Sequence, residues 1–102
     1  MARLSTDDIQ AIKHSVEAVL GQDSSYTLWL FGSRANDSLR GGDIDLLVET
    51  PLDVGNRVRA AGLIYAKIIR SIGDRKIDLL LKDGKTGEAP IFEIARATGE
   101  KL

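Results

Sequence analysis

Three short apolar segments alternate with longer amphipathic ones along this chain. The apolar segments are residues 26–31, 44–49 and 76–82, and glycine or proline residues follow the first two closely. Segments of this length and composition are typical of buried strands. The chain can therefore build a small sheet, and its other segments must supply the layers that cover that sheet.

The segments around the strands show helical periodicity, with apolar residues recurring every three or four positions. Residues 5–20 form the first predicted helix, with Ser5 as its capping residue. Residues 53–72 form the longest predicted helix, and residues 90–98 form a short one that begins with proline and ends before glycine. The expected buried seam of the long helix consists of Val54, Val58, Ala61, Tyr65, Ile68 and Ile72.

The order of these elements predicts an α/β (α+β) fold: a small mixed sheet of three or more strands flanked by helices. The crossover through the long helix permits parallel pairing of the second and third strands and leaves antiparallel pairing open. A chain of 102 residues has the size of one domain. We therefore expect residues 1–102 to form a single domain, without a second, substrate-binding domain.

The composition of the chain excludes several kinds of site and protein class. The absence of cysteine excludes disulfides and thiolate metal sites. The 14 basic and 15 acidic residues give a net charge of -1, so we expect no direct binding to nucleic acid. No apolar run approaches the roughly 20 residues that cross a bilayer, and the N-terminus does not resemble a signal peptide. The expected location is the cytoplasm, away from membranes.

Two carboxylates, Asp43 and Asp45, stand at the head of the second predicted strand. Because side chains alternate along a strand, both point to the same face. A divalent cation relieves their repulsion, and hard oxygen ligands favour Mg²⁺ or Mn²⁺. Such a pair by itself is more often a solvated turn.

Asp78 lies among apolar neighbours in the third predicted strand, where burial would be costly unless the carboxylate were paired or bound to metal. If the third strand lies beside the second, Asp78 joins the face that carries Asp43 and Asp45. Three carboxylates can hold two metal ions. The combination is therefore a candidate metal site.

Gly32 and Ser33 follow the first predicted strand directly. Glycine lets the backbone turn tightly and lets a phosphate approach it, and Ser33 offers a hydroxyl and a backbone N–H group. These residues are a candidate phosphate cradle, although the same pair is commonly a plain turn. Arg34 comes next and either contacts a phosphate or forms a surface ion pair.

Taken together, the runs Leu30–Ala35 (LFGSRA) and Gly42–Val48 (GDIDLLV) resemble the signature of the polymerase-β-like nucleotidyltransferase superfamily. Within it, the chain is most similar to the minimal nucleotidyltransferases, the MNT proteins, over nearly its whole length, including Asp78. It departs at Gly42, where family members often have serine, but that position supports the turn and is not a ligand.

The resemblance implies a nucleotidyltransferase fold and the transfer of a nucleoside monophosphate, AMP from ATP, to a hydroxyl. It implies that Asp43 and Asp45 bind both metal ions of a two-metal site. It implies that Asp78 binds the second metal ion and accepts the proton of the acceptor hydroxyl. It assigns Gly32 and Ser33 to the outer phosphates, with Arg34 beside them.

MNT proteins are commonly antitoxins of HEPN toxins, which are helical ribonucleases, and some adenylylate a tyrosine of the toxin. The resemblance therefore implies a HEPN-type partner and a tyrosine acceptor. Two alternatives are an antitoxin that acts by binding alone and an enzyme that modifies a small molecule. The complete set of acids favours catalysis, and the sequence leaves the base preference and homo-oligomer formation open.

The long predicted helix is also unusually basic. From residue 54 to 73 it contains four cations and no acid. Arg59, Lys67 and Arg70 share one stripe with Leu63. A solvated surface explains such a stripe, but it also fits a docking surface for an acidic protein or an RNA-binding toxin.

Overall fold

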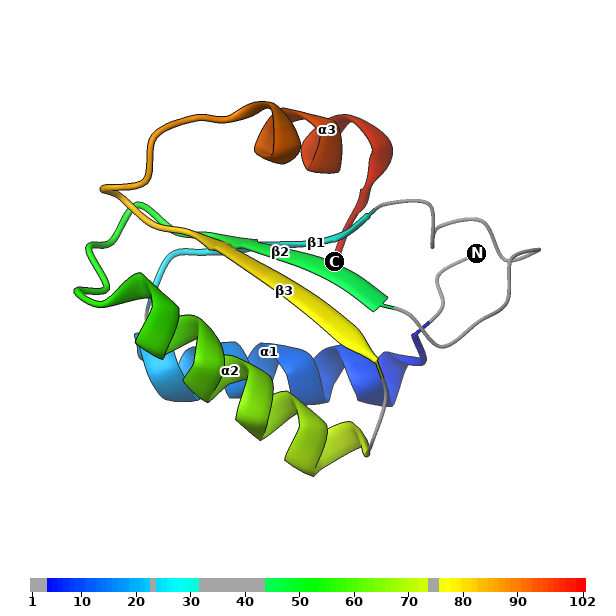
Figure 1. The fold of residues 1–102 in the computed structure, drawn as a ribbon. Coiled ribbons are helices and arrows are strands. Elements are labelled where there is room, and N and C mark those ends of the chain that lie inside the picture. The colour runs from blue at the N-terminus through cyan, green and yellow to red at the C-terminus, as the bar shows by residue number, and fades with distance from the viewer. Residues whose placement is uncertain (1–3, 23, 32–43, 74–75) are drawn as a thin grey trace.

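The computed structural model describes residues 4–22, 24–31, 44–73 and 76–102, which form one layered unit (Figure 1). Within these ranges there are three helices and four strands. In chain order they are α1 (Thr6–Leu20), β1 (Thr27–Phe31), β2 (Ile44–Glu49), α2 (Arg57–Ile72), β3 (Ile77–Lys82), α3 (Pro90–Thr98) and β4 (Glu100–Lys101). The predicted α+β class is confirmed.

The four strands form one mixed sheet in the order β3-β2-β1-β4. β1 pairs antiparallel with both β2 and β4, whereas β2 pairs parallel with β3. The crossover through α2 is therefore the parallel one that the sequence permitted. The short strand β4 was not predicted.

Helices cover both faces of the sheet (Figure 1). α1 and α2 lie together against one face, and α3 lies against the other. Alternation along each strand divides the apolar side chains between the two layers. The strand residues of the α1–α2 side are Leu28, Leu30, Ile44, Leu46, Val48, Ile77, Leu79 and Leu81, and those of the α3 side are Trp29, Phe31, Leu47 and Leu80.

Helix α1 begins as predicted. The Ser5 hydroxyl accepts a hydrogen bond of 3.0 Å from the Asp8 N–H, and the Asp8 carboxylate accepts one from the Ser5 N–H. This reciprocal pair satisfies two N–H groups that have no partner inside the helix. Ser5 is therefore the N-cap of the helix.

Helix α2 differs from its predicted extent, because it begins at Arg57 and not at residue 53. Gly55 has a φ of +76°, which breaks the helical backbone, and the Asn56 side chain caps the new start by accepting from the Arg59 N–H at 3.0 Å. The segment before the helix is tied elsewhere: the Val54 N–H donates to the Asp83 carboxylate at 3.2 Å.

The predicted apolar seam of α2 is also wrong in part. The buried residues are Ala60, Ile64 and Ile68, while Val58 is 78% exposed and Tyr65 is exposed as well. Spacings of three and four recur on neighbouring stripes of a helix, and the packing against α1 and the sheet selects the stripe centred on Ile64. None of the helices within the described ranges is long and apolar enough to cross a membrane.

Candidate active site

Asp45 and Asp78 are direct neighbours in the parallel β2–β3 pair. The pairs on either side of them are Ile44 with Ile77 and Leu46 with Leu79. Residues paired in this way project from the same face of a sheet, with neighbouring strands about 4.8 Å apart. The fold therefore brings together two of the three predicted metal-binding carboxylates.

The two carboxylates lie on the face that carries α3. Asp45 pairs with Phe31 of β1, and Phe31 packs with Leu47 and Phe92 in the cluster under α3. Phe31 ends β1, while Asp45 and Asp78 each stand second in their strands. The site is therefore at the end of the sheet where β1 stops and the parallel pair begins, next to an apolar floor.

Exposure separates the two acids. Asp45 is half-buried, whereas Asp78 is exposed. The expectation that Asp78 suffers a burial penalty is therefore wrong. Its neighbours Ile77 and Leu79 turn toward α1 and α2, and alternation along the edge strand sends Asp78 to solvent. A solvated carboxylate at this place is accessible to a ligand.

The remaining predicted site residues are Asp43, Gly32, Ser33 and Arg34, and they lie outside the described residues. The described chain stops at Phe31 and resumes at Ile44, and β1 and β2 pair side by side there. Both ends of the connecting segment therefore leave the sheet at the acidic end. Its roles in metal and phosphate binding stay predictions.

The two carboxylates of the described residues fit a hard cation. Asp45 and Asp78 supply carboxylate oxygens only, which suits Mg²⁺ or Mn²⁺. Within the described ranges no cluster of three histidine or acidic side chains is close enough to hold a metal ion. A third carboxylate, nucleotide phosphates and water would have to complete the coordination sphere.

A polar network that the sequence interpretation missed anchors α3 on the same face. The Trp29 indole N–H donates to Glu49 at 3.0 Å, and Arg96 of α3 forms ion pairs with both Glu49 and Glu88. Glu49 lies on the same side of β2 as Asp45 and Leu47, since it is four residues from one and two from the other. The even spacing of Glu49 from Asp45 and Leu47 could have predicted from the sequence that it lies on this face. The network secures α3 toward the opposite end of β2 from Asp45.

Comparison with known families gives one match. The sequence model of a family described as "Nucleotidyltransferase domain" matches residues 12–97. That range contains every described helix and strand except the first turns of α1, the end of α3 and β4. No curated protein matches the chain significantly.

Proposed function

Because this chain belongs to the nucleotidyltransferase domain family, within the polymerase-β-like superfamily, we propose that it transfers AMP from ATP to a hydroxyl in a metal-dependent reaction. The observation that carries the proposal is the pairing of Asp45 with Asp78 on one face of the sheet. Two carboxylates that project from one face at neighbouring positions can both supply oxygen ligands to a divalent cation.

Asp43, Asp45 and Asp78 would hold the divalent ions, which when bound neutralise charge on the phosphates and on the entering oxygen. Gly32, Ser33 and Arg34 would bind the outer phosphates and so orient the α-phosphate for attack. Each of these roles follows the family resemblance, and the exposed position of Asp78 supports its place on the acceptor side.

The chemical step balances without any further reactant. The acceptor oxygen forms a bond to the α-phosphorus, and the bond from that phosphorus to the bridging oxygen breaks, so that pyrophosphate leaves. The proton of the acceptor hydroxyl passes to the Asp78 carboxylate. Asp78 is suited to this role because its side chain is open to solvent, where an acceptor can approach.

We further propose that the chain is an MNT-type antitoxin whose acceptor is a tyrosine of a HEPN-type toxin in the cytoplasm. The exposed position of Asp78 suits an acceptor carried by a second protein. Neutralisation by contact alone is the second candidate, and the exposed basic residues Arg59, Lys67 and Arg70 on α2 favour it.

A labelling experiment tests transfer directly. The protein is incubated with Mg²⁺ and the product of the neighbouring gene, with ATP labelled at either the α- or the γ-phosphate. Transfer of AMP labels the partner only from the α-position and releases pyrophosphate. Competition with the other three nucleoside triphosphates then defines the base preference.

Matched variants locate the activity. Asp45→Asn and Asp78→Asn should each abolish labelling, whereas Asp7→Asn, the same change at an exposed acid of α1, should not. Labelling from the γ-phosphate would indicate a kinase instead. Complete labelling by Asp45→Asn would remove the acidic pair from the mechanism.

A further inference from the structure

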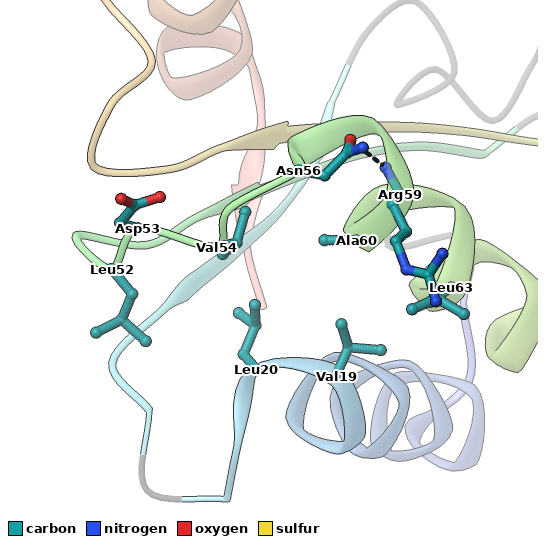
Figure 2. Close-up of a pocket in the computed structure, with 9 residues that line it drawn as sticks. All are labelled: Val19, Leu20, Leu52, Asp53, Val54, Asn56, Arg59, Ala60 and Leu63. Atoms are coloured by element: carbon teal, nitrogen blue, oxygen red, sulfur yellow. Dashed lines mark hydrogen bonds between the residues drawn. The ribbon is translucent and has the colours of Figure 1, made fainter.

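Two hollows open along the seam between α1 and α2, on the side of the sheet opposite the acids. The first, of about 340 Å³, is shown in Figure 2. The second, of about 220 Å³, is formed by His14, Ser15 and Ala18 of α1 and by Lys67, Arg70 and Ser71 of α2. We refer to the two together as the α1–α2 groove.

The basic stripe of α2 forms one wall of this groove. Arg59 and Leu63 line the first hollow, and Lys67 and Arg70 line the second. These four residues span about 16 Å along the helix, since each residue advances it by about 1.5 Å. The stripe therefore borders both hollows over about three helical turns.

The cations in this wall have no partner within the described residues. Arg59, Lys67 and Arg70 are exposed, and none of their side chains makes a hydrogen bond or ion pair to another described residue. Among the described residues that line the two hollows, Asp53 is the one acid, and it pairs with Lys85 at 3.1 Å. Among the described residues, the groove thus carries positive charge without a paired acid, on a chain of net charge -1.

The first hollow also offers an apolar floor. In Figure 2, Val19 and Leu20 rise from α1 toward Ala60 of α2, with Leu63 and Leu52 at the rim. Leu63 is 45% exposed and Leu52 is 40% exposed. An apolar centre flanked by cations is the complement of an amphipathic helix with acidic edges.

We propose that the α1–α2 groove binds an acidic amphipathic helix of a partner protein. An apolar side chain of that helix fills the hollow at Leu63, and its carboxylates meet Arg59 at one end and Lys67 and Arg70 at the other. A helix of about three turns matches the length of the basic wall. Opposite charge raises the association rate, and arginine is enriched among residues that dominate binding energy.

A protein helix suits the groove better than nucleic acid does. A nucleic acid backbone calls for a run of cations, yet Leu63 interrupts this stripe, and six of the nine described residues that line the first hollow are apolar. The inference goes beyond the proposed transfer reaction and does not depend on it. The groove and the acidic pair lie on opposite sides of the sheet, so either can fail without the other.

The test uses designed peptides and the whole protein. A fluorescent peptide of about 20 residues, long enough to be helical alone, carries glutamates on both edges of a leucine face. Two control peptides are used: one has lysine in place of every glutamate, and the other has the same residues in scrambled order. A single-stranded RNA tests whether the groove binds nucleic acid instead. Anisotropy measures binding to wild type, to Arg59→Glu/Arg70→Glu, and to Lys13→Glu/Lys101→Glu.

The control pair makes the same change in net charge at residues that line a different hollow, beside Glu17 and Tyr26. The acidic peptide should bind wild type and lose affinity about tenfold or more with Arg59→Glu/Arg70→Glu, but less than about twofold with the control. Leu63→Ser should also weaken binding, whereas Val58→Ser, at an exposed residue outside the groove, should not. Circular dichroism melts establish that each variant is folded.

Three results would overturn the proposal. One is that wild type does not bind the acidic peptide, and another is equal binding by wild type and Arg59→Glu/Arg70→Glu. The third is that RNA binds in place of the peptide and is lost with the same double variant. Binding of ATP should be unchanged in all of these variants, which separates a failure of docking from a failure of transfer.

Discussion

Asp78 lies beside Asp45 in register across the parallel β2–β3 pair, and both side chains leave the sheet on the face that carries α3. The two are 33 positions apart in the sequence, and the helix α2 between them provides the crossover that makes the strands parallel. Like charges placed directly opposite each other destabilise a sheet. The face that Asp45 and Asp78 share can offer oxygen ligands from both strands to one cation.

Asp78→Asn should stop transfer while leaving nucleotide binding nearly intact. The side chain is exposed, so its replacement by an isosteric amide removes the proton acceptor without disturbing the core. Single-turnover kinetics, ATP titration by calorimetry and urea unfolding measure the three quantities. Transfer at the wild-type rate would show that the third-carboxylate assignment is wrong.

The predicted cradle is tested by two changes of different kind. Ser33→Ala should weaken binding of the triphosphate by about 1 kcal/mol, the scale of one lost hydrogen bond. Gly32→Val should weaken it much more, because a branched side chain blocks both the turn and the approach of a phosphate. Calorimetric titration with ATP compares them, and equal losses would argue against a cradle.

Asp83 should make stability depend on pH in the acidic range. This buried carboxylate accepts hydrogen bonds from the Thr86 hydroxyl at 2.7 Å and from the backbone N–H groups of Lys85 and Val54. The Thr86 hydroxyl, followed by the backbone donors, holds the pKa of Asp83 below its ordinary value. A lowered pKa in the folded state stabilises the protein above the unfolded pKa of about 4, and this contribution is lost as the pH falls through the folded pKa.

Asp83→Asn should therefore be less stable than wild type near neutral pH, with a difference that shrinks as the pH drops below about 4. Urea unfolding at a series of pH values measures both proteins. Asp7→Asn, the same change at an exposed acid of α1, controls for the loss of one surface charge. A constant difference between Asp83→Asn and wild type at every pH would contradict this account.

Gly84 and Gly87 form a matched pair in the loop after β3. A Cβ atom at Gly84 would lie 2.2 Å from the Pro51 carbonyl oxygen, and the Gly84 N–H donates to the Leu52 carbonyl at 2.8 Å. Gly84→Ala should therefore force two loops apart and cost about 1–3 kcal/mol. A Cβ at Gly87 meets nothing within 4 Å, so Gly87→Ala should change stability by less than about 0.5 kcal/mol. Thermal unfolding of both variants gives the comparison, and equal shifts would exclude the steric explanation.

The alternation of apolar segments was enough to predict most of the fold. β2 and α3 have their predicted bounds, and β1 and β3 begin one residue later than expected, at Thr27 and Ile77. These elements could be predicted because burial imposes a strong local pattern of apolar residues on the sequence. β4 is only two residues long, which is too short to carry such a pattern, and its pairing with Trp29 and Leu30 depends on tertiary contacts.

The orientation of α2 and the exposure of Asp78 could not be predicted from local pattern. The helix offers apolar side chains on adjacent stripes, and contact with α1 decides that Ile64 is buried while Tyr65 is exposed. Asp78 has apolar neighbours in sequence, but they project to the other face of an edge strand. Asp45 and Asp78 come together because β3 lies beside β2. The sequence analysis named this arrangement as a condition, but the local pattern could not decide whether it is met.

The central position of β2 has a consequence for dynamics. Four of its residues, Ile44, Leu46, Leu47 and Val48, are completely inaccessible to solvent, and strands pair with it on both sides. Such a strand opens only when the whole domain unfolds, so its amide hydrogens should exchange with the solvent most slowly. Asp45 therefore stands on the most persistent element of the protein. Asp78 is carried by the edge strand β3, whose outward-facing amides should exchange sooner. Asp45 is therefore held on a rigid strand, whereas Asp78 can adjust its position to a ligand.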